Sequence, residues 1–185
     1  MANIRLTHGM RETILFRLLK HAFEDREKEI LRERHTLGND IYNDVYSKDM
    51  RRKMKALPGG FLPTSRSLSV AFGGQIHNAE FEDPRPVAED HGGYSPARSY
   101  DAKDEFSIRH FDIERSTAAL NEERGRAKAA AKAVLNICTT LKGFLEIWPE
   151  AAPFVEDFKK SSAPVLALTV SIKDLNKQLG LDDVA

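Results

Sequence analysis

A cluster of basic side chains lies next to a glycine-rich segment of the chain. Its members are Arg51, Arg52, Lys53, Lys55 and Arg66, and Gly59-Gly60 falls among them. Guanidinium and ammonium groups donate charge-assisted hydrogen bonds to phosphate, and glycine leaves backbone N–H groups accessible to the same anion. We therefore predict that these five side chains form a site for phosphate or nucleic acid.

The same cluster also has a structural interpretation. Lysine and arginine in the last turn of a helix complement the negative end of its dipole, and Pro58 is expected to end a helix directly after them. The spacing of a P-loop does not occur in the sequence. The sequence leaves both interpretations open, and no cofactor is expected.

The six histidines are a second candidate for chemistry. No two of them flank a glutamate at helical spacing, and the chain has one cysteine, so a zinc site is not expected and no metal is assigned. His77, Asp83 and His91 occur in an acid-rich stretch that could gather a weakly bound metal ion, and they could act as acid–base groups if the protein is an enzyme. Scattered surface side chains are the alternative. Cys138 is predicted to be a core side chain, because a reactive thiol needs cationic, accessible surroundings.

One periodic pattern dominates the elements that would position these residues. Apolar residues recur every seven positions over residues 106–148, which is typical of a helix that presents a narrow stripe to a helical partner. The stripe consists of Phe106, Ile113, Leu120, Ala127, Val134, Leu141 and Trp148. We predict one long helix over residues 103–148, whose striped part is about 64 Å long if unbroken at ~1.5 Å per residue.

A first long helical region is predicted over residues 7–57. Apolar residues crowd its beginning, and a charged stretch follows at residues 24–34. Gly38-Asn39 is expected to break or kink it, and Pro58-Gly59-Gly60 to end it. The two helices therefore have apolar parts at opposite ends, which predicts that they pair antiparallel.

A second row of residues on the helix over residues 103–148, here called its second seam, predicts which part of the helix pair is packed in a core and which part is solvated. Positions four after each stripe residue are polar up to Arg124 and small or apolar beyond it. We predict that residues 127–148 pack in a globular base. Residues 106–126 and residues 24–37 would form a thinner, solvated stalk, a coiled-coil hairpin projecting from that base.

The segment between the helices, residues 58–100, has a different composition. Two short runs with alternating apolar residues flank Gly73-Gly74, which predicts a β-hairpin. Residues 84–100 are expected to be an exposed loop, and residues 149–185 to form short helices after Trp148-Pro149 stops the second long helix. The fold class is thus mainly α with a small β element (α+β), as a single domain over residues 1–185.

Overall charge restricts the classes of partner. The chain has 28 basic and 28 acidic residues, so no global field attracts nucleic acid or a membrane. Residues 1–57 carry 13 basic and nine acidic side chains, a net charge of +4, which places any anion-binding face there. No secretory apolar region or membrane-spanning stretch is visible. We expect a cytoplasmic protein without a membrane partner.

Three stretches of the sequence carry a family resemblance. They are residues 4–14, residues 44–63 and residues 139–150, and Leu175-Asn176 adds to them. With these stretches the chain resembles bacteriophage proteins grouped as "nucleotide modification associated domain 5". The resemblance implies a phage-encoded protein, located in the host cytoplasm and linked with hypermodified phage DNA. It implies no catalytic residues.

Three hypotheses for function follow. The first is an accessory of DNA or nucleotide modification that binds nucleotide, DNA or a modifying enzyme. The second is a non-catalytic interaction protein that inhibits a host enzyme or defence complex through its helix faces. The third is a modifying enzyme. A homo-oligomer is also compatible with the stripe, because a parallel dimer and an internal hairpin use the same residues.

Overall fold

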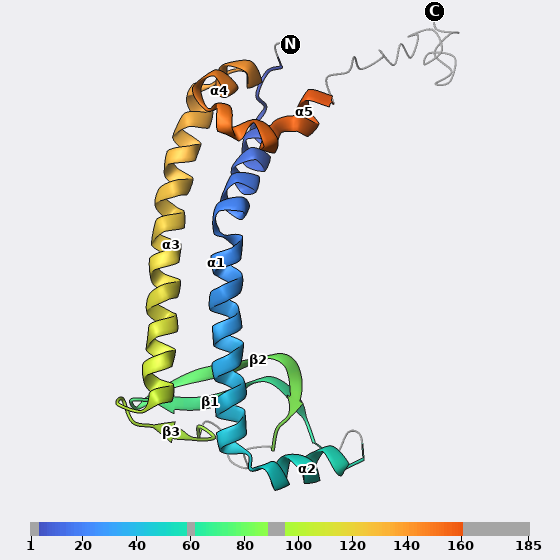
Figure 1. The fold of residues 1–185 in the computed structure, drawn as a ribbon, viewed down its shortest axis with the longest axis vertical. Coiled ribbons are helices and arrows are strands. Elements are labelled where there is room, and N and C mark those ends of the chain that lie inside the picture. Colours follow the sequence, from blue (N-terminus) through green and yellow to red (C-terminus); the bar gives the residue numbers. More distant parts are fainter. Residues whose placement is uncertain (1–3, 59–61, 89–94, 161–185) are drawn as a thin grey trace, which may run out of the picture. The chain divides into compact units, whose positions relative to one another are not determined.

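The computed structural model describes residues 4–58, 62–88 and 95–160 (Figure 1). The elements are α1 (His8–Val45), α2 (Lys48–Ala56), β1 (Thr64–Phe72), β2 (Gln75–Pro86), β3 (Ser99–Tyr100), α3 (Glu105–Ile137), α4 (Leu141–Ile147), the 3-10 helix η1 (Pro149–Val155) and α5 (Glu156–Lys160). The predicted class, mainly α with a small β element, is confirmed. With 38 residues, α1 has the length expected of a hairpin stalk.

The chain divides into two compact units, and both long helices contribute to each. The terminal unit comprises, among the described residues, 4–22 and 126–160. The central unit comprises 23–58, 62–88 and 95–125. No helix in the part of the chain that the structure describes is long and apolar enough to cross a lipid bilayer.

In the central unit α1 and α3 lie side by side and antiparallel. Ion pairs near residues 26–27 of α1 reach residues 123–124 of α3, and those further along α1 reach earlier residues of α3. They are Arg26–Glu123 (2.8 Å), Glu27–Arg124, Arg34–Glu114 (3.0 Å) and Asp40–Arg109 (2.9 Å). Such accessible pairs contribute only ~0–1 kcal/mol each, so they set the register more than the stability. The predicted pairing of residues 24–37 with residues 106–126 is confirmed, whereas its coiled-coil form stays a prediction.

The prediction of a thin, solvated stalk over residues 106–126 fails for its first part, residues 106–113, whereas most side chains of residues 114–126 are exposed. Ser107, His110 and Ile113 are buried, because the sheet packs on this end of α3. The core of the central unit consists of Leu37, Ile41, Tyr42, Tyr46, Leu68, Val70, Phe72, Ala79, Phe81, Tyr100 and Ile113. The helical pattern missed this core because the sheet, not a second helix, covers the polar positions of the seam.

The sheet has the strand order β2-β1-β3 (Figure 1). β1 and β2 form the predicted hairpin, whose turn residues Gly73 and Gly74 have φ values of 55° and 84°. Both angles lie in the left-handed region, which a tight hairpin turn of this kind requires and which glycine adopts without strain. β3 pairs parallel with the end of β1. The prediction of a loop over residues 84–100 is therefore wrong at both of its ends.

Gly38 does not break or kink α1, contrary to the prediction. The helix continues through it, and a methyl group at this position would lie 1.9 Å from the Glu80 carbonyl oxygen of β2. Glycine is thus needed because the helix backbone approaches the strand closely. The helical region breaks instead after Val45. Ser47 caps α2, and its side chain accepts a hydrogen bond from the Met50 N–H at 3.3 Å.

The terminal unit has its own core, to which α1, α3, α4 and η1 contribute. Its buried apolar residues are Leu6, Ile14, Leu15, Leu19, Ala131, Leu135, Cys138, Leu141, Phe144, Ala151 and Val155. The prediction that Cys138 is a core side chain is confirmed, and burial raises the pKa of its thiol. Val134 of the stripe is only half-buried, whereas its neighbour Leu135 is 1% exposed.

The predicted unbroken helix over residues 103–148 is wrong, because α3 ends at Ile137 and α4 begins at Leu141. The Arg11 side chain donates to the carbonyl oxygens of Leu135 (3.0 Å) and Cys138 (2.9 Å). These bonds satisfy carbonyls that a helix end leaves without partners. The Thr140 side chain then caps α4. Trp148-Pro149, predicted to stop the long helix, instead follows the end of the short helix α4 at Ile147. The short helix predicted near the C-terminus lies outside the described residues.

Candidate functional site

The central unit contains a cleft whose lining is strongly basic. Its volume is about 610 Å³, and it lies where α2 faces the end of β2. The lining residues are Tyr42, Lys48, Arg51, Arg52, Lys55, Pro84, Arg85 and Pro86. Of these described lining residues, five are cations and none is acidic. Such a lining attracts anions, because closely spaced like charges in a concave surface focus the field into it.

Four of the cations come from one stripe of α2. Lys48, Arg51, Arg52 and Lys55 occur at helical spacings of three, four and seven, so they share one face of the helix. The cap at Ser47 sets where this helix begins and thereby which side chains that face carries. The structure therefore brings together three of the five residues proposed from sequence, namely Arg51, Arg52 and Lys55.

The other two proposed residues do not line the cleft. Lys53 is an exposed residue of α2, and Arg66 is exposed on β1, where the pairing with β2 shifts between Ser65 and Ser67. Gly59-Gly60 lies outside the described residues. Sequence reasoning missed Lys48 and Arg85. The helical spacing from Arg51 could have identified Lys48, whereas Arg85 reaches the cleft only through the packing of the hairpin.

The helix dipole accounts for only part of this basic cluster. Lys53 and Lys55 stand in the last turn of α2, where cations complement the negative helix end. Lys48, Arg51 and Arg52 stand in its first half, at the positive end, where a cation is electrostatically unfavourable. The helix dipole therefore does not explain these three side chains.

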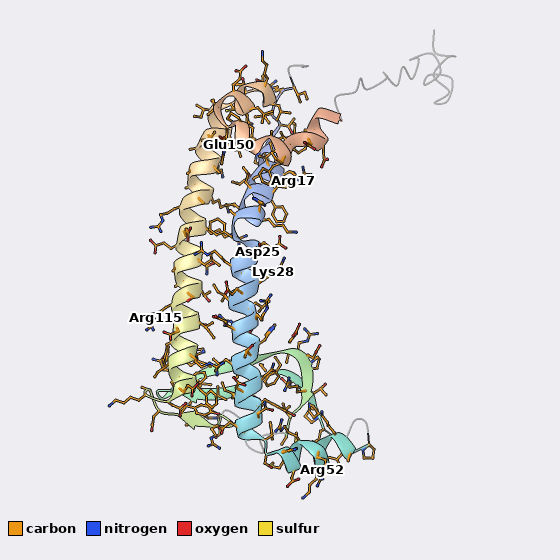
Figure 2. All side chains as sticks on the ribbon, viewed as in Figure 1. Arg17, Asp25, Lys28, Arg52, Arg115 and Glu150 are labelled. Atoms are coloured by element: carbon orange, nitrogen blue, oxygen red, sulfur yellow. The ribbon has the colours of Figure 1, made fainter. Side chains whose placement is uncertain are left out.

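Few acidic groups neutralise the cations of the cleft. Arg52 pairs with Asp49 at 3.3 Å, but both side chains are more than three-quarters exposed, and Figure 2 shows Arg52 projecting outward from α2. Arg51 donates to the Asn43 side-chain oxygen, while its Nε is buried without a partner among the described residues. Within the same part of the chain, neither Lys48 nor Lys55 has an ion pair.

Another part of the cleft lining combines an aromatic ring, that of Tyr42, with the guanidinium group of Arg85. The Cζ atom of Arg85 lies 5.0 Å from the ring centre of Tyr42 and 5.6 Å from that of Phe81. The Tyr42 hydroxyl donates to the Pro86 carbonyl oxygen at 2.8 Å. Burial raises the pKa of Tyr42, so its phenol stays neutral. The arrangement fixes Arg85 in place through cation–π contact.

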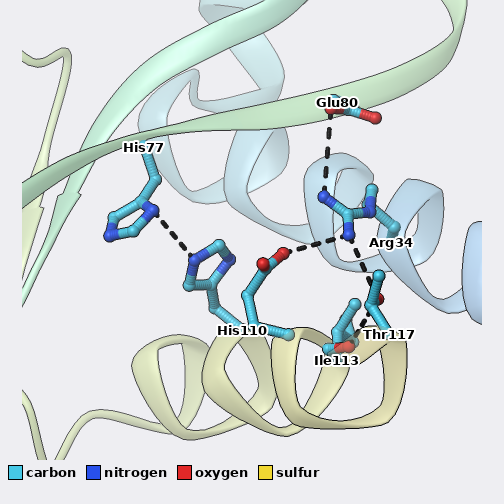
Figure 3. A network of polar contacts seen from close by, with 7 residues as sticks. Arg34, His77, Glu80, His110, Ile113 and Thr117 are labelled. Atoms are coloured by element: carbon cyan, nitrogen blue, oxygen red, sulfur yellow. Dashed lines mark hydrogen bonds and ion pairs between the residues drawn. The ribbon is translucent and has the colours of Figure 1, made fainter. Parts of the chain in front are cut away.

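A second polar cluster lies between β2, α1 and α3 (Figure 3). A ring nitrogen of His110 lies 3.1 Å from one of His77, and the His110 ring stacks on Phe72. Nearby, Arg34 bonds Glu114 and Thr117 and approaches Glu80. His77 thus faces another histidine rather than the acids expected from sequence. Asp83 is exposed, and His91 lies outside the described residues.

The buried histidine predicts a pH dependence of stability. Burial, followed by the charge of nearby His77, lowers the pKa of His110 below its usual 6.5, with Glu114 and Arg34 as the other charged neighbours. The folded protein therefore binds this proton less readily than the unfolded chain. Above about pH 6.5 the contribution of His110 to the free energy of unfolding should be constant. As the pH decreases below this value, the free energy of unfolding should decrease, with a slope of up to about 1.4 kcal/mol per pH unit.

Urea unfolding between about pH 7.5 and pH 5.5 measures this slope. The variant His110→Phe keeps an aromatic ring on Phe72 and removes the titrating group, so its slope should be smaller. His8→Gln, at an exposed position, is the matched control and should keep the original slope. An unchanged slope in His110→Phe would show that His110 titrates normally.

Among the described residues, no three His, Cys, Asp or Glu side chains converge as ligands of a metal ion. Comparison with known proteins gave one match. A family model described as "nucleotide modification associated domain 5" matches residues 5–182, nearly the whole chain. Neither the curated proteins nor the solved structures contain a significant match.

Proposed function

We propose, because the chain belongs to the nucleotide modification associated domain 5 family, that it serves nucleotide modification by binding phosphate groups in its basic cleft. The ligand is a nucleotide or a nucleic acid. The observation that carries this proposal is that four cations of one α2 stripe line a single cleft together with Arg85, and that no acid is found among the described lining residues. Family membership supports an association with nucleotide modification, and the positive charge of the cleft supports phosphate binding there.

The chemistry of the lining favours binding over catalysis. Among the described lining residues, the polar side chains are cations and the neutral phenol of Tyr42, and neither kind accepts a proton near neutral pH. Each charge-assisted hydrogen bond to phosphate contributes about 1.5–3 kcal/mol. Several such bonds give useful affinity without any reaction. We therefore propose an accessory role, in which the protein presents or retains a phosphate-bearing ligand for a modifying enzyme.

Binding of inorganic tripolyphosphate and of a single-stranded oligonucleotide of about 20 nucleotides, which exceeds the ~4–16-nucleotide sites of single-strand binding folds, tests this function. At least one of the two should bind, and its affinity should fall steeply as salt rises. The double variant Arg51→Ala/Arg52→Ala should weaken that binding by about tenfold or more, because two charged donors are lost. Isothermal titration calorimetry gives the affinities.

Lys53→Ala is the matched control, because it removes a cation from the same helix but not from the cleft. Its affinity should stay within about twofold of the original, since only weak long-range attraction is lost. Thermal melting verifies that each variant is folded. The proposed function is wrong if neither ligand binds, or if Lys53→Ala weakens binding as much as the double variant.

A further inference from the structure

We infer, on the basis of the proposed function, that the ligand of the cleft is a single nucleotide with linked phosphates, whose base stacks on Arg85. The α2 cations hold the phosphates in this arrangement, and Arg85 distinguishes a nucleotide from a bare phosphate chain. The distribution of charge, the size of the cleft and the geometry of Arg85 each support it.

Charge pairing along the helices argues against a long nucleic-acid track. Arg26, Arg34, Arg109, Arg115 and Arg124 of α1 and α3 each pair with a carboxylate. A protein that follows a nucleic-acid backbone needs a groove of available cations along it. In the central unit the helix faces are largely neutralised, whereas the cleft keeps its positive charge.

The size of the cleft agrees with a small ligand. Its volume of about 610 Å³ lies within the range of roughly 300–1,000 Å³ that is typical of small-molecule sites. The cation stripe runs from Lys48 to Lys55, about 10 Å along the helix at ~1.5 Å per residue. A short chain of linked phosphates can therefore contact several of these side chains at once.

Arg85 provides the second, chemically different end of the site. Its guanidinium carbon lies over the rings of Tyr42 and Phe81, both of which are buried, and the residue also lines the cleft. A guanidinium plane held on an aromatic ring is a surface on which a nucleic-acid base can stack. Pro84 and Pro86 add apolar lining beside it. The part of the cleft formed by Arg85 and the prolines thus suits the flat, partly apolar base of a nucleotide. The part formed by α2 suits the phosphates of the same nucleotide.

The test compares deoxyadenosine triphosphate with inorganic tripolyphosphate on the wild-type protein by calorimetry. Both carry a three-phosphate chain, and tripolyphosphate has one more ionisable oxygen, so tighter binding of the nucleotide must come from its nucleoside. Base stacking predicts that the nucleotide binds at least about fivefold more tightly. A single-stranded oligonucleotide should gain no affinity as it is lengthened from about 5 to about 20 nucleotides, because the cleft holds one nucleotide.

The variant Arg85→Lys keeps the positive charge and removes the plane. It should bring the two affinities to within about twofold of each other while tripolyphosphate binding changes less than about threefold. Arg66→Lys is the matched control on the neighbouring strand, at an exposed position outside the cleft. It should preserve the preference for the nucleotide. If Arg85→Lys does not fold, the relative affinities of the wild-type protein for deoxyadenosine triphosphate and tripolyphosphate still test the inference.

Equal affinities of the nucleotide and tripolyphosphate would overturn the inference and leave the phosphate site in place. Oligonucleotide binding that strengthens with length, together with no binding of the nucleotide, would also overturn it and would assign the cleft to a nucleic-acid strand. Failure of all three ligands to bind would overturn both the inference and the proposed function.

Discussion

Gly38→Ala should destabilise the protein by about 3 kcal/mol, the upper end of the cost of overpacking. An added methyl group would lie 1.9 Å from the Glu80 carbonyl oxygen and 2.8 Å from its carbonyl carbon. Both are backbone atoms, so no side-chain rotation relieves the overlap, and α1 and β2 must move apart. On helix propensity alone the same change would stabilise by about 1 kcal/mol. The steric cost should exceed the gain in helix propensity, because relieving the overlap displaces a strand of the core.

Urea unfolding followed by circular dichroism measures this loss. Gly125→Ala is the matched control, because Gly125 lies inside α3 in the same unit and a methyl group there would meet nothing within 4 Å. That variant should be stabilised by up to about 1 kcal/mol. If Gly38→Ala were equally stabilised, the close approach of α1 to β2 would be wrong.

Leu135→Asp should have the largest effect in the terminal unit, a loss of about 4 kcal/mol or more. Leu135 is 1% exposed, and an aspartate there would leave a charge buried without a partner, which costs about as much as breaking a buried ion pair, ~3–5 kcal/mol. Trp148, the only tryptophan of the chain, lies in the same unit and reports its unfolding by fluorescence.

Ile137→Asp provides the control for this charge. Ile137 belongs to the last turn of the same helix and is 73% exposed. An acid there costs at most about 1 kcal/mol, through repulsion by the negative helix end. Comparable losses in the two variants would contradict the assignment of Leu135 to the core.

The sequence predicted the elements whose pattern is local. The seven-residue stripe identified a helix pair, and all seven of its members are buried or half-buried. The alternation on either side of Gly73-Gly74 identified the hairpin, because the turn and both strands are contiguous in the chain. The basic cluster was visible for the same reason, since α2 carries four cleft cations within eight residues.

Features that depend on long-range packing could not be predicted. Arg85 belongs to the cleft only because the end of β2 packs beside Tyr42 of α1. His110 occupies a polar position of the helical seam and is buried because Phe72 of β1 stacks on it. Gly38 resembled a helix breaker because the sequence does not show the strand it approaches. In each case the deciding neighbour is more than 30 positions away in the chain.

The most direct test of the phosphate site is a titration of tripolyphosphate into the isotopically labelled wild-type protein, followed by nuclear magnetic resonance. The cleft predicts that the largest shift changes occur at the backbone amides of Lys48–Ala56 and at the side-chain Nε–H groups of Arg51 and Arg85. Amides of α3 should change little. Absence of shift changes, or changes centred outside α2 and the end of β2, would contradict the assignment of the cleft as a phosphate-binding site.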